Sequence, residues 1–383
     1  MSDPLAFARE ELARLERDAL LRDVHALDTA QEAEVFRDGR RLLLFASNNY
    51  LGLASDPRVI DAAAEAAHRW GVGAGSARLI TGATRLHDEL EDAIASFKHT
   101  DAALLFSSGY LANIGTIAAL AGPDDAIFSD ELNHASIIDG SRLARAQVHV
   151  YRHADVAHLE QLLRTSTARR KLVVTDSVFS MDGDLAPLPA IVEACEATDA
   201  ILMVDEAHAT GVVGPGGRGA VAHCALDGRV PVIMGTLSKS LGAAGGYIAG
   251  STDLVAFLRN RARAFIFDTA MPAPVAAAAK RALEVLTAIP ELALRVRGNA
   301  ARLADGLGLP HPDAAIVPIV VGSSENALRL SDTLLRDGIL VPAIRPPTVP
   351  AGTARLRTTV MATHTDEHID AFVDAFARAT VPA

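Results

Sequence analysis

The sequence contains the stretch Ala200-Ile201-Leu202-Met203-Val204-Asp205-Glu206-Ala207-His208, in which an apolar run ends in ionisable residues. A second stretch of this kind follows, Val232-Ile233-Met234-Gly235-Thr236-Leu237-Ser238-Lys239-Ser240. A short apolar run between turn residues is typical of a strand that is buried on both faces. Both stretches therefore predict charged side chains at the end of a buried strand.

The same pattern recurs along the chain from about residue 102. Helical patterns such as Leu111–Leu120 and Ala190–Ala197 lie between apolar runs. This alternation predicts an α/β fold, a mostly parallel sheet with helices on both faces. Active sites of such sheets lie at the carboxyl ends of the strands. The predicted strands are Ala102–Phe106, Ala126–Phe128, Val148–Tyr151, Leu172–Val174, Ile201–Val204, Val232–Met234 and Tyr247–Ala249.

The two ends of the chain predict smaller units beside this large domain at residues 46–283. Leu5–Leu27 has apolar residues at helical spacing and Arg41–Ala46 predicts a strand, so residues 1–45 are expected to form an N-terminal arm. Residues 284–383 predict a smaller C-terminal α+β domain. Its expected helices are Glu284–Leu307, Glu325–Asp337 and Asp366–Ala379, and its expected strands are Ala315–Val321, Ile339–Ala343 and Arg355–Thr359.

The composition favours a cytoplasmic protein that binds neither membranes nor nucleic acid. The 383 residues are 50% hydrophobic and carry a net charge of −11, with no basic patch of the kind that nucleic-acid binders show. The charged N-terminus is unlike a signal peptide, and no apolar run is long enough to span a membrane. Cys195 and Cys224 form neither a disulfide framework nor a metal-binding spacing, so we expect no metal.

Asp205, His208 and Lys239 have the chemistry to hold a ring cofactor. A buried carboxylate needs a partner such as a protonated ring nitrogen, and His208 can hydrogen-bond another ring substituent. Lys239 is one of four lysines, and it alone stands at a predicted strand end among Gly, Ser and Thr. Burial there lowers a lysine pKa and exposes a nucleophilic amine. The alternatives are a carboxylate that caps a helix and a lysine in a surface loop.

Three more predicted strands end in polar loops. Ser107–Asn113 joins a strand to a helix, and free N–H groups at a helix start bind phosphate. His134 follows the next strand and can stack on a flat ring. Ser180 lies in the polar stretch Asp176–Asp184, which suits a loop that faces a ligand. A helix cap, a surface histidine and an exposed turn are the alternatives.

A proline-rich loop with arginines joins two predicted strands of the small domain. The run Ala343–Arg357 contains three prolines, which stiffen it. Arg345 and Arg357 can bind carboxylates in bidentate fashion. The alternative is a rigid connector with exposed arginines.

In their order along the chain, these motifs resemble those of the fold-type-I pyridoxal-phosphate enzymes, and more narrowly the α-oxoamine synthases. The resemblance implies a fold-type-I transferase, pyridoxal 5′-phosphate as cofactor, an acyltransferase reaction and a homodimer with shared active sites. The resembling segments extend over nearly the whole chain and are Ser47–Leu53, Ser107–Asn113, Asn133–Ser136, Val178–Asp184, Asp205–Gly211, Thr236–Gly242 and Arg345–Arg357.

The resemblance also implies a role for each matching residue. Lys239 would hold the cofactor as a Schiff base and act as general base, His134 would stack on the ring, and Asp205 would pair with its nitrogen. The cofactor hydroxyl would lie near His208 and Ser180. The phosphate would be surrounded by Ser108, Gly109, Tyr110, Thr236 and Ser238, with Thr269 reaching it from a neighbouring subunit. The amino-acid carboxylate would be held by Asn48 and Arg357, and the acyl substrate by Arg22 and Arg345. Thr348 is a further expected substrate-binding residue.

Within that family, the run Arg345–Arg357 most resembles the members that join L-alanine to pimeloyl-CoA, or to a pimeloyl carrier protein, in biotin biosynthesis. The alternative is a synthase that uses glycine, such as 2-amino-3-ketobutyrate CoA ligase. Two positions depart from the alanine pattern. Asn49 stands where Asp is more common, and Ala209-Thr210 follow His208 where Gly is usual.

Parts of the sequence also resemble two other classes of protein. Asp205-Glu206-Ala207-His208 also spells a helicase-type box, but an NTPase needs Gly directly before Lys-Ser, where this chain has Ser238. A non-catalytic binding protein on the same fold is the remaining alternative. The presence of Lys239, Asp205 and His134 together favours an enzyme.

Overall fold

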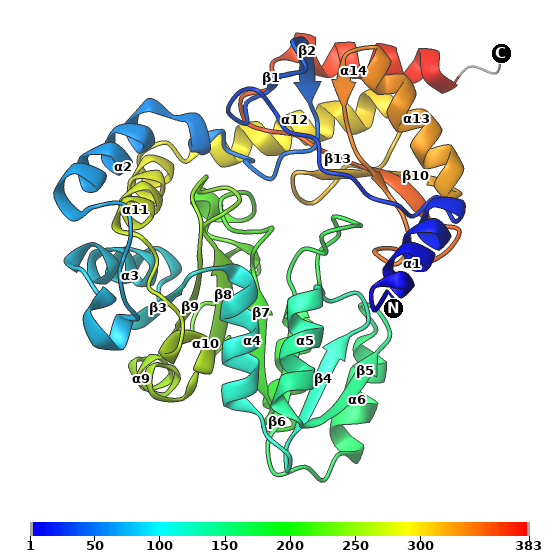
Figure 1. Cartoon of the computed structure of the whole chain (residues 1–383). Coiled ribbons are helices and arrows are strands. Elements are labelled where there is room, and N and C mark those ends of the chain that lie inside the picture. The colour runs from blue at the N-terminus through cyan, green and yellow to red at the C-terminus, as the bar shows by residue number, and fades with distance from the viewer. Residues whose placement is uncertain (1–2, 381–383) are drawn as a thin grey trace.

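A seven-stranded sheet forms the centre of the computed structural model, which describes residues 3–380 (Figure 1). The strands lie in the order β3-β9-β8-β7-β6-β4-β5, with β9 antiparallel to both of its neighbours and the other pairs parallel. The predicted mostly parallel sheet is confirmed. Its strands are β3 (Ala102–Phe106), β4 (Ala126–Asp130), β5 (Gln147–Tyr151), β6 (Lys171–Asp176), β7 (Ile201–Asp205), β8 (Val232–Thr236) and β9 (Gly246–Gly250).

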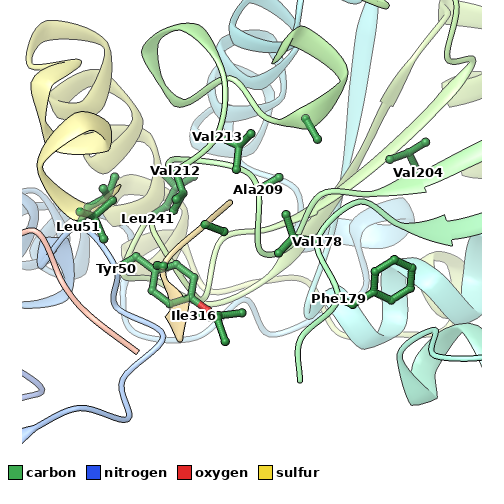
Figure 2. Packing of buried hydrophobic residues seen from close by; sticks show 14 of the residues in the cluster. Tyr50, Leu51, Val178, Phe179, Val204, Ala209, Val212, Val213, Leu241 and Ile316 are labelled. Atoms are coloured by element: carbon green, nitrogen blue, oxygen red, sulfur yellow. The ribbon is translucent and has the colours of Figure 1, made fainter. Parts of the chain in front are cut away.

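Successive residues of each strand face opposite sides of this sheet. In β7, Leu202 and Val204 join one buried cluster, whereas Met203 joins another. Figure 2 shows part of the first cluster. Both faces are covered, which is why the strands are continuous apolar runs. The helices on the first side are α3 (Arg85–Lys98), α6 (Val156–Thr165), α7 (Leu188–Glu196) and α11 (Ala273–Ala288), and those on the second are α4 (Gly109–Leu120), α5 (Ala135–Ala144), α9 (Thr252–Arg261) and α10 (Arg263–Ile266).

The remaining helical segments of this unit are short or peripheral. The helix α2 (Pro57–Trp70) packs on α11, as Figure 1 shows, and α8 (Ala220–His223) is a single turn. Further single turns lie at Leu53–Ser55, Arg78–Gly82 and Pro215–Gly217. No helix within residues 3–380 combines the length and the hydropathy that a membrane span requires.

Two small sheets build the second unit of the fold. One contains β10 (Ile316–Gly322), β13 (Ala354–Thr359) and β12 (Ala343–Ile344), and the other β1 (Glu34–Arg37), β2 (Arg40–Leu44) and β11 (Ile339–Leu340). Strand β2 pairs with both β1 and β11, so two strands of the predicted N-terminal arm form one sheet with a strand from the C-terminal part of the chain. The helices of this unit are α12 (Glu291–Leu307), α13 (Ser324–Arg336) and α14 (Asp366–Thr380). Residues 1–2 and 381–383, at the ends of the predicted arm and small domain, lie outside the described residues.

Three sequence predictions for these regions are wrong in detail. The predicted helix Leu5–Leu27 is shorter, α1 (Ala6–Arg17), because Ala19 takes a left-handed φ of 54° that no helix continues through. The segment Glu284–Leu307 is divided at Pro290, which lacks the N–H that a continuous helix needs. The strand Ile339–Ala343 is split between two sheets around Pro342 for the same reason. The domain division predicted at residues 283 and 284 falls within α11 and stays a prediction.

Strand β9 and the start of α4 approach so closely that only glycine fits between them. A Cβ on Gly246 would lie 2.6 Å from the Cα of Gly109. We expect Gly246→Ala to lower the free energy of unfolding by about 1–3 kcal/mol through overpacking, as measured by urea denaturation. Gly298 in α12 is the matched control, because nothing lies within 4 Å of its added Cβ. There alanine should raise stability by about 0.5–1 kcal/mol, and equal effects at both positions would contradict the close approach.

Candidate active site

A cavity of about 260 Å³ lies at the carboxyl ends of the parallel strands. Asp176, Asp205 and Met234 are register partners on β6, β7 and β8, so the loops that follow these strands meet at one edge of the sheet. The predicted cofactor-binding residues line this cavity except for Thr269; they are Ser108, Gly109, Tyr110, His134, Ser180, Asp205, His208, Thr236, Ser238 and Lys239.

Lys239 projects into this cavity from the turn after β8. Its Nζ lies 2.8 Å from Nε2 of His208. The turn is closed by two backbone hydrogen bonds, from Leu237 N–H to the Gly245 carbonyl and from Gly242 N–H to the Lys239 carbonyl. Burial lowers the pKa of Lys239 to about 8, although the nearby carboxylates oppose the shift. Near pH 8 much of this amine is therefore neutral and nucleophilic.

His208 is held by a chain of hydrogen bonds that the sequence did not reveal. Its Nδ1 lies 2.7 Å from the hydroxyl of buried Tyr50, which in turn donates to Oδ1 of Asn48 at 3.1 Å. Burial, followed by the charges of Lys239 and Arg357, holds the pKa of His208 well below its usual value. The imidazole is therefore neutral, and with Lys239 as donor to Nε2 it donates from Nδ1 to Tyr50.

The Tyr50 hydroxyl is expected to matter because it fixes the His208 ring. Tyr50→Phe leaves a buried imidazole nitrogen without a partner, so we expect kcat/KM to fall by about tenfold, the worth of one such hydrogen bond. Steady-state kinetics measure the effect. Tyr151→Phe is the matched control, because the buried Tyr151 hydroxyl makes no hydrogen bond within residues 3–380. A loss of activity in the control equal to that in Tyr50→Phe would contradict this role.

One wall of the cavity carries two buried carboxyl groups, those of Asp205 and Asp176. Asp205 is buried, and its carboxylate accepts hydrogen bonds from Asn113 Nδ2 at 2.7 Å and from Ala207 N–H at 2.8 Å. Burial and the charge of Asp205 raise the pKa of Asp176 well above its usual value. No lysine, arginine or histidine of residues 3–380 forms an ion pair with either carboxylate.

A cation is therefore the group that this wall lacks, and a protonated ring nitrogen would supply it. The Oδ1 atom of Asn113 is buried without a hydrogen-bond partner, which also marks space for a ligand. The sequence interpretation did not name Asp176 or Asn113 as site residues. Asp176 carried a weaker form of the signal of Asp205, because one polar residue, Thr175, separates it from the apolar run Leu172–Val174.

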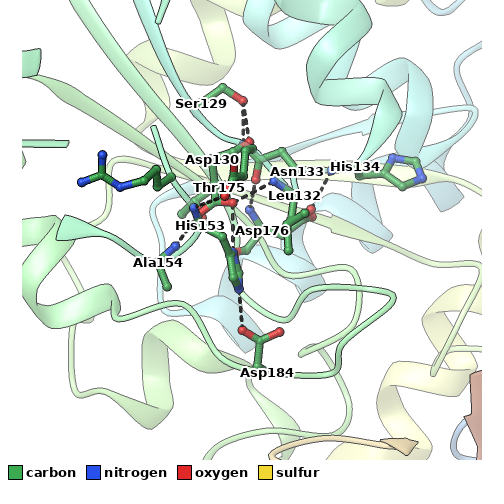
Figure 3. A network of polar contacts seen from close by, with 12 residues as sticks. Ser129, Asp130, Leu132, Asn133, His134, His153, Ala154, Thr175, Asp176 and Asp184 are labelled. Atoms are coloured by element: carbon green, nitrogen blue, oxygen red, sulfur yellow. Dashed lines mark hydrogen bonds and ion pairs between the residues drawn. The ribbon is translucent and has the colours of Figure 1, made fainter. Parts of the chain in front are cut away.

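His134 and the loop of Ser180 are positioned by a polar network beside this wall (Figure 3). Asp176 accepts from the backbone N–H of His134 at 2.7 Å. His153 bridges two carboxylates, with Nδ1 at 3.0 Å from Asp130 and Nε2 at 2.8 Å from Asp184, the last residue of the polar loop. Burial lowers the pKa of His153, but its two carboxylate partners raise it overall. The charged imidazole thus anchors the loop that presents Ser180.

The end of the cavity at the start of α4 suits a phosphate. Ser108 is the N-cap of α4, and its Oγ accepts from Leu111 N–H at 3.1 Å. The hydroxyls of Thr236 and Ser238 lie 2.7 Å apart on the facing loop. The first N–H groups of a helix have no partner inside the helix, and the helix dipole favours an anion there. Ser108 is thus both the helix cap and a wall of the cavity.

Asn48 and Arg357 do not line the cavity, but they contact each other beside it, and Arg357 also contacts Ser180, which does line it. Buried Arg357 on β13 donates to Asn48 Oδ1 at 3.2 Å, to the Tyr50 hydroxyl at 3.5 Å and to the Ser180 carbonyl. A guanidinium beside neutral acceptors keeps its positive charge uncompensated. The pair is well placed to receive a carboxylate next to His208.

Arg22, Arg345 and Thr348 do not line this cavity. Arg22 donates to the Pro346 carbonyl at 3.4 Å, and Arg345 donates to the carbonyls of Ala19 and Leu21. Burial, and then the charge of Arg22, lower the pKa of Arg345. Within residues 3–380 no carboxylate pairs with either arginine. Thr348 is exposed and donates from its N–H to the Arg345 carbonyl.

Thr269 lies beside the cavity and does not line it. Its carbonyl accepts from Ser107 Oγ at 3.0 Å, and its backbone bridges to Ala77. Its predicted contribution to a neighbouring subunit stays a prediction. Asn49, which stands where Asp is more common in the alanine-using synthases, is buried. Its Nδ2 donates to the Gln31 carbonyl and its Oδ1 accepts from Ala54 N–H, so its role is structural.

The chain matches the family described as aminotransferase class I and II over residues 40–376. The 8-amino-7-oxononanoate synthase of Symbiobacterium thermophilum is 45% identical over 97% of each chain. That of Anaeromyxobacter dehalogenans (strain 2CP-1) is 49% identical over 96% of this chain and 94% of its own.

Two solved structures show the same fold. Serine palmitoyltransferase from S. paucimobilis, with a bound PLP–myriocin aldimine, has a TM-score of 0.93 at 33% identity, covering 99% of this chain and 98% of that one. The 8-amino-7-oxononanoate synthase of Francisella tularensis has a TM-score of 0.74 at 26% identity. The match covers 88% of this chain and 97% of that one. By family match and by full-length identity, this chain belongs to the class I and II aminotransferase family and, within it, to the 8-amino-7-oxononanoate synthases.

Proposed function

We propose that this protein joins L-alanine to the acyl group of pimeloyl-CoA, or of a pimeloyl carrier protein, and releases 8-amino-7-oxononanoate, CO2 and free thiol in biotin biosynthesis. The observation that carries the proposal is the contact of Lys239 with neutral His208 in a cavity that buried Asp205 also lines. The names of relatives at 45–49% identity support the reaction. We further propose a cytoplasmic homodimer whose sites are each completed by Thr269 of the partner subunit.

The residues of the cavity fit pyridoxal phosphate, which supplies an electron sink for the bond that breaks at the α-carbon of the amino acid. Lys239 would hold it covalently, and Asp205 would pair with its ring nitrogen. His134 would cover the ring face. The start of α4, with Ser108 and Thr236, would bind the phosphate.

Lys239 is the base for the α-proton in this proposal. Burial keeps a large share of its amine neutral near pH 8, so it can accept a proton. Once protonated, Lys239 donates to Nε2 of His208, and Asp205 and Asp176 stabilise the new charge. Tyr50 and Asn48 hold the His208 ring in the orientation that keeps Nε2 toward the amine.

Arg357 is the proposed partner of the amino-acid carboxylate. We expect Arg357→Ala to weaken alanine binding by about 10- to 100-fold, the loss of a charge-assisted hydrogen bond, with little change in cofactor affinity. Spectroscopic titrations measure both. Arg355→Ala is the matched control, because Arg355 contacts the loop of Ser180 at the Met181 carbonyl without touching Asn48 or Tyr50. An alanine dissociation constant that Arg357→Ala leaves unchanged would contradict this role.

The pair of arginines at Arg22 and Arg345 favours a dicarboxylic acyl donor. A pimeloyl thioester ends in a free carboxylate, which two adjacent guanidiniums without a carboxylate partner can bind. Acetyl-CoA, the donor for the alternative glycine-using ligase, carries no such group. The arrangement therefore supports the pimeloyl assignment over that alternative.

A panel of amino acids and acyl thioesters tests the proposed function. L-Alanine, glycine and L-serine are combined with pimeloyl-CoA, acetyl-CoA and palmitoyl-CoA, and products are identified by mass. L-Alanine with pimeloyl-CoA is expected to give the highest kcat/KM. A higher value for glycine with acetyl-CoA, or for serine with palmitoyl-CoA, would show that the assignment is wrong.

A further inference from the structure

A buried ion pair lies behind the cavity, on the loop that carries His208. The Nζ of Lys98 is 2.6 Å from Oε2 of Glu206, and the two side chains are 2% and 0% exposed. Lys98 ends α3, and Glu206 directly follows β7. Neither residue has a part in the proposed reaction. Replacing such a pair by apolar side chains often leaves stability unchanged or higher, so stability alone does not account for it.

The side-chain hydrogen bonds of this pair converge on one segment, residues 206–221. Besides Glu206, Lys98 Nζ donates to Thr210 Oγ1 at 2.9 Å and to the Arg218 carbonyl at 2.5 Å. The three hydrogens of the ammonium group are thus all used. The other carboxylate oxygen of Glu206 accepts from Val221 N–H at 2.8 Å. The ion pair therefore ties together the beginning, the middle and the end of the segment.

This segment packs directly against the turn of Lys239. A Cβ on Gly211 would lie 2.4 Å from the Cβ of Ser240, the residue after Lys239. Val212 and Leu241 belong to the same buried cluster, as Figure 2 shows. His208 stands between Glu206 and Thr210, both of which Lys98 contacts. A shift of the segment must therefore move His208 relative to Lys239.

The atoms around the Glu206 carboxylate are packed closely, so this ion pair can fix the position of residues 206–221. A Cβ on Gly219 would lie 2.3 Å from Oε2 of Glu206, so only glycine leaves room for the backbone beside this carboxylate. The Tyr247 hydroxyl lies 3.1 Å from Thr210 Oγ1 and closes the other side. Burial by itself lowers the pKa of Lys98, but the charge of Glu206 raises it overall, so the ammonium stays charged.

We propose that Lys98 and Glu206 are positioning residues, which hold residues 206–221 so that His208 Nε2 stays against Lys239 Nζ and water stays out of the space behind it. The proposal rests on the proposed function in one respect, that Lys239 is the reacting amine. The proposal also gives a role to Thr210, which stands in a stretch where Gly is usual. Its hydroxyl accepts a hydrogen bond from the Lys98 ammonium group.

The test measures the amine of Lys239 in the cofactor-free protein. The double variant K98M/E206Q removes both charges together, so no lone charge stays buried, and Gln keeps an acceptor for Val221 N–H. Protein is treated with trinitrobenzenesulfonate across a pH series, and labelling of the Lys239 peptide is quantified by mass spectrometry. The wild-type midpoint is expected near pH 8. The double variant should shift it upward by about one pH unit or more, because water reaches the amine.

The matched control is K280M/E89Q. Lys280 and Glu89 form a second Lys–Glu pair at the same distance of 2.6 Å, half-exposed, and Glu89 also lies on α3. This variant should leave the midpoint of Lys239 labelling unchanged. Circular dichroism and thermal melting establish that each variant folds. An unchanged or lower midpoint in folded K98M/E206Q overturns the proposal.

A second variant covers the case in which K98M/E206Q does not fold. Thr210→Val keeps the ion pair and the side-chain shape but removes one contact of Lys98, and it should produce a smaller upward shift. No shift in folded Thr210→Val would then overturn the proposal.

In the cofactor-loaded enzyme, a folded K98M/E206Q should lose about 10- to 100-fold in kcat with an unchanged KM for alanine, as misplacement of a catalytic contact does. If the wild-type enzyme makes no 8-amino-7-oxononanoate while K98M/E206Q still shifts the midpoint of Lys239 labelling upward, the proposed function alone is refuted.

Discussion

Replacing Lys239 with alanine is expected to lower kcat for the condensation of L-alanine with pimeloyl-CoA by at least about 10²–10⁴-fold, the contribution of a general base. The physical reason is that within residues 3–380 no other amine lines the cavity. Lys239 Nζ is buried, lies 2.8 Å from His208 and has its pKa lowered to about 8. Product formation with excess cofactor, followed by mass spectrometry, measures the loss.

Two further variants show whether the loss of activity comes from the missing amine. Alternative causes are the missing positive charge and a nonspecific effect of removing any lysine. Lys239→Arg keeps the charge, but a guanidinium does not lose its proton, so this variant should be as inactive as Lys239→Ala. Lys280→Ala removes a half-exposed lysine on α11 and should keep full activity. Activity of Lys239→Arg close to the wild-type value would contradict the role of Lys239 as base.

Replacing Asp205 with asparagine is expected to lower kcat by about 10²–10³-fold, the effect of losing one preorganised electrostatic contact. Asparagine keeps the shape of the side chain but removes the charge that would face a protonated ring nitrogen. Since Asp205 also raises the pKa of Asp176, its loss should let Asp176 ionise more readily and compensate in part. Steady-state kinetics with saturating cofactor measure the change in kcat.

Asp125→Asn is the matched control for this variant. Asp125 is also buried, but it precedes β4 at the opposite end of the strand and pairs with Arg169 and Arg170. Its replacement should lower thermal stability and leave kcat unchanged. A loss of kcat in Asp205→Asn no larger than in Asp125→Asn would mean that Asp205 acts through the fold alone.

The strands and the main site residues could be predicted because their signals are local. Each strand of the large sheet is a short apolar run, since both of its faces are buried. Asp205 and Lys239 stand where such runs end, and active sites of parallel sheets lie at those ends. The sequence also separated Lys239 from the other lysines by its Gly, Ser and Thr neighbours, and Lys239 does line the cavity.

The partners of these residues could not be predicted, because they come from distant parts of the chain. Tyr50 contacts a histidine 158 positions away, and Lys98 pairs with a carboxylate 108 positions away. The sequence places Lys98 in a charged helical stretch, where nothing distinguishes it from a solvated lysine. Asp176 joins Asp205 only through the order and register of the strands, which the apolar runs do not specify. Proline breaks at Pro290 and Pro342 were missed because the flanking patterns continue on both sides.

The measurement that tests the central claim most directly is borohydride reduction of the protein loaded with pyridoxal phosphate. Visible absorbance is recorded before and after reduction, and the modified peptide is identified by mass spectrometry. We predict an absorbance band that reduction removes, and a pyridoxyl adduct on the peptide that contains Lys239. Protein that stays colourless with added cofactor, or an adduct on Lys98, Lys171 or Lys280 in place of Lys239, would contradict the account.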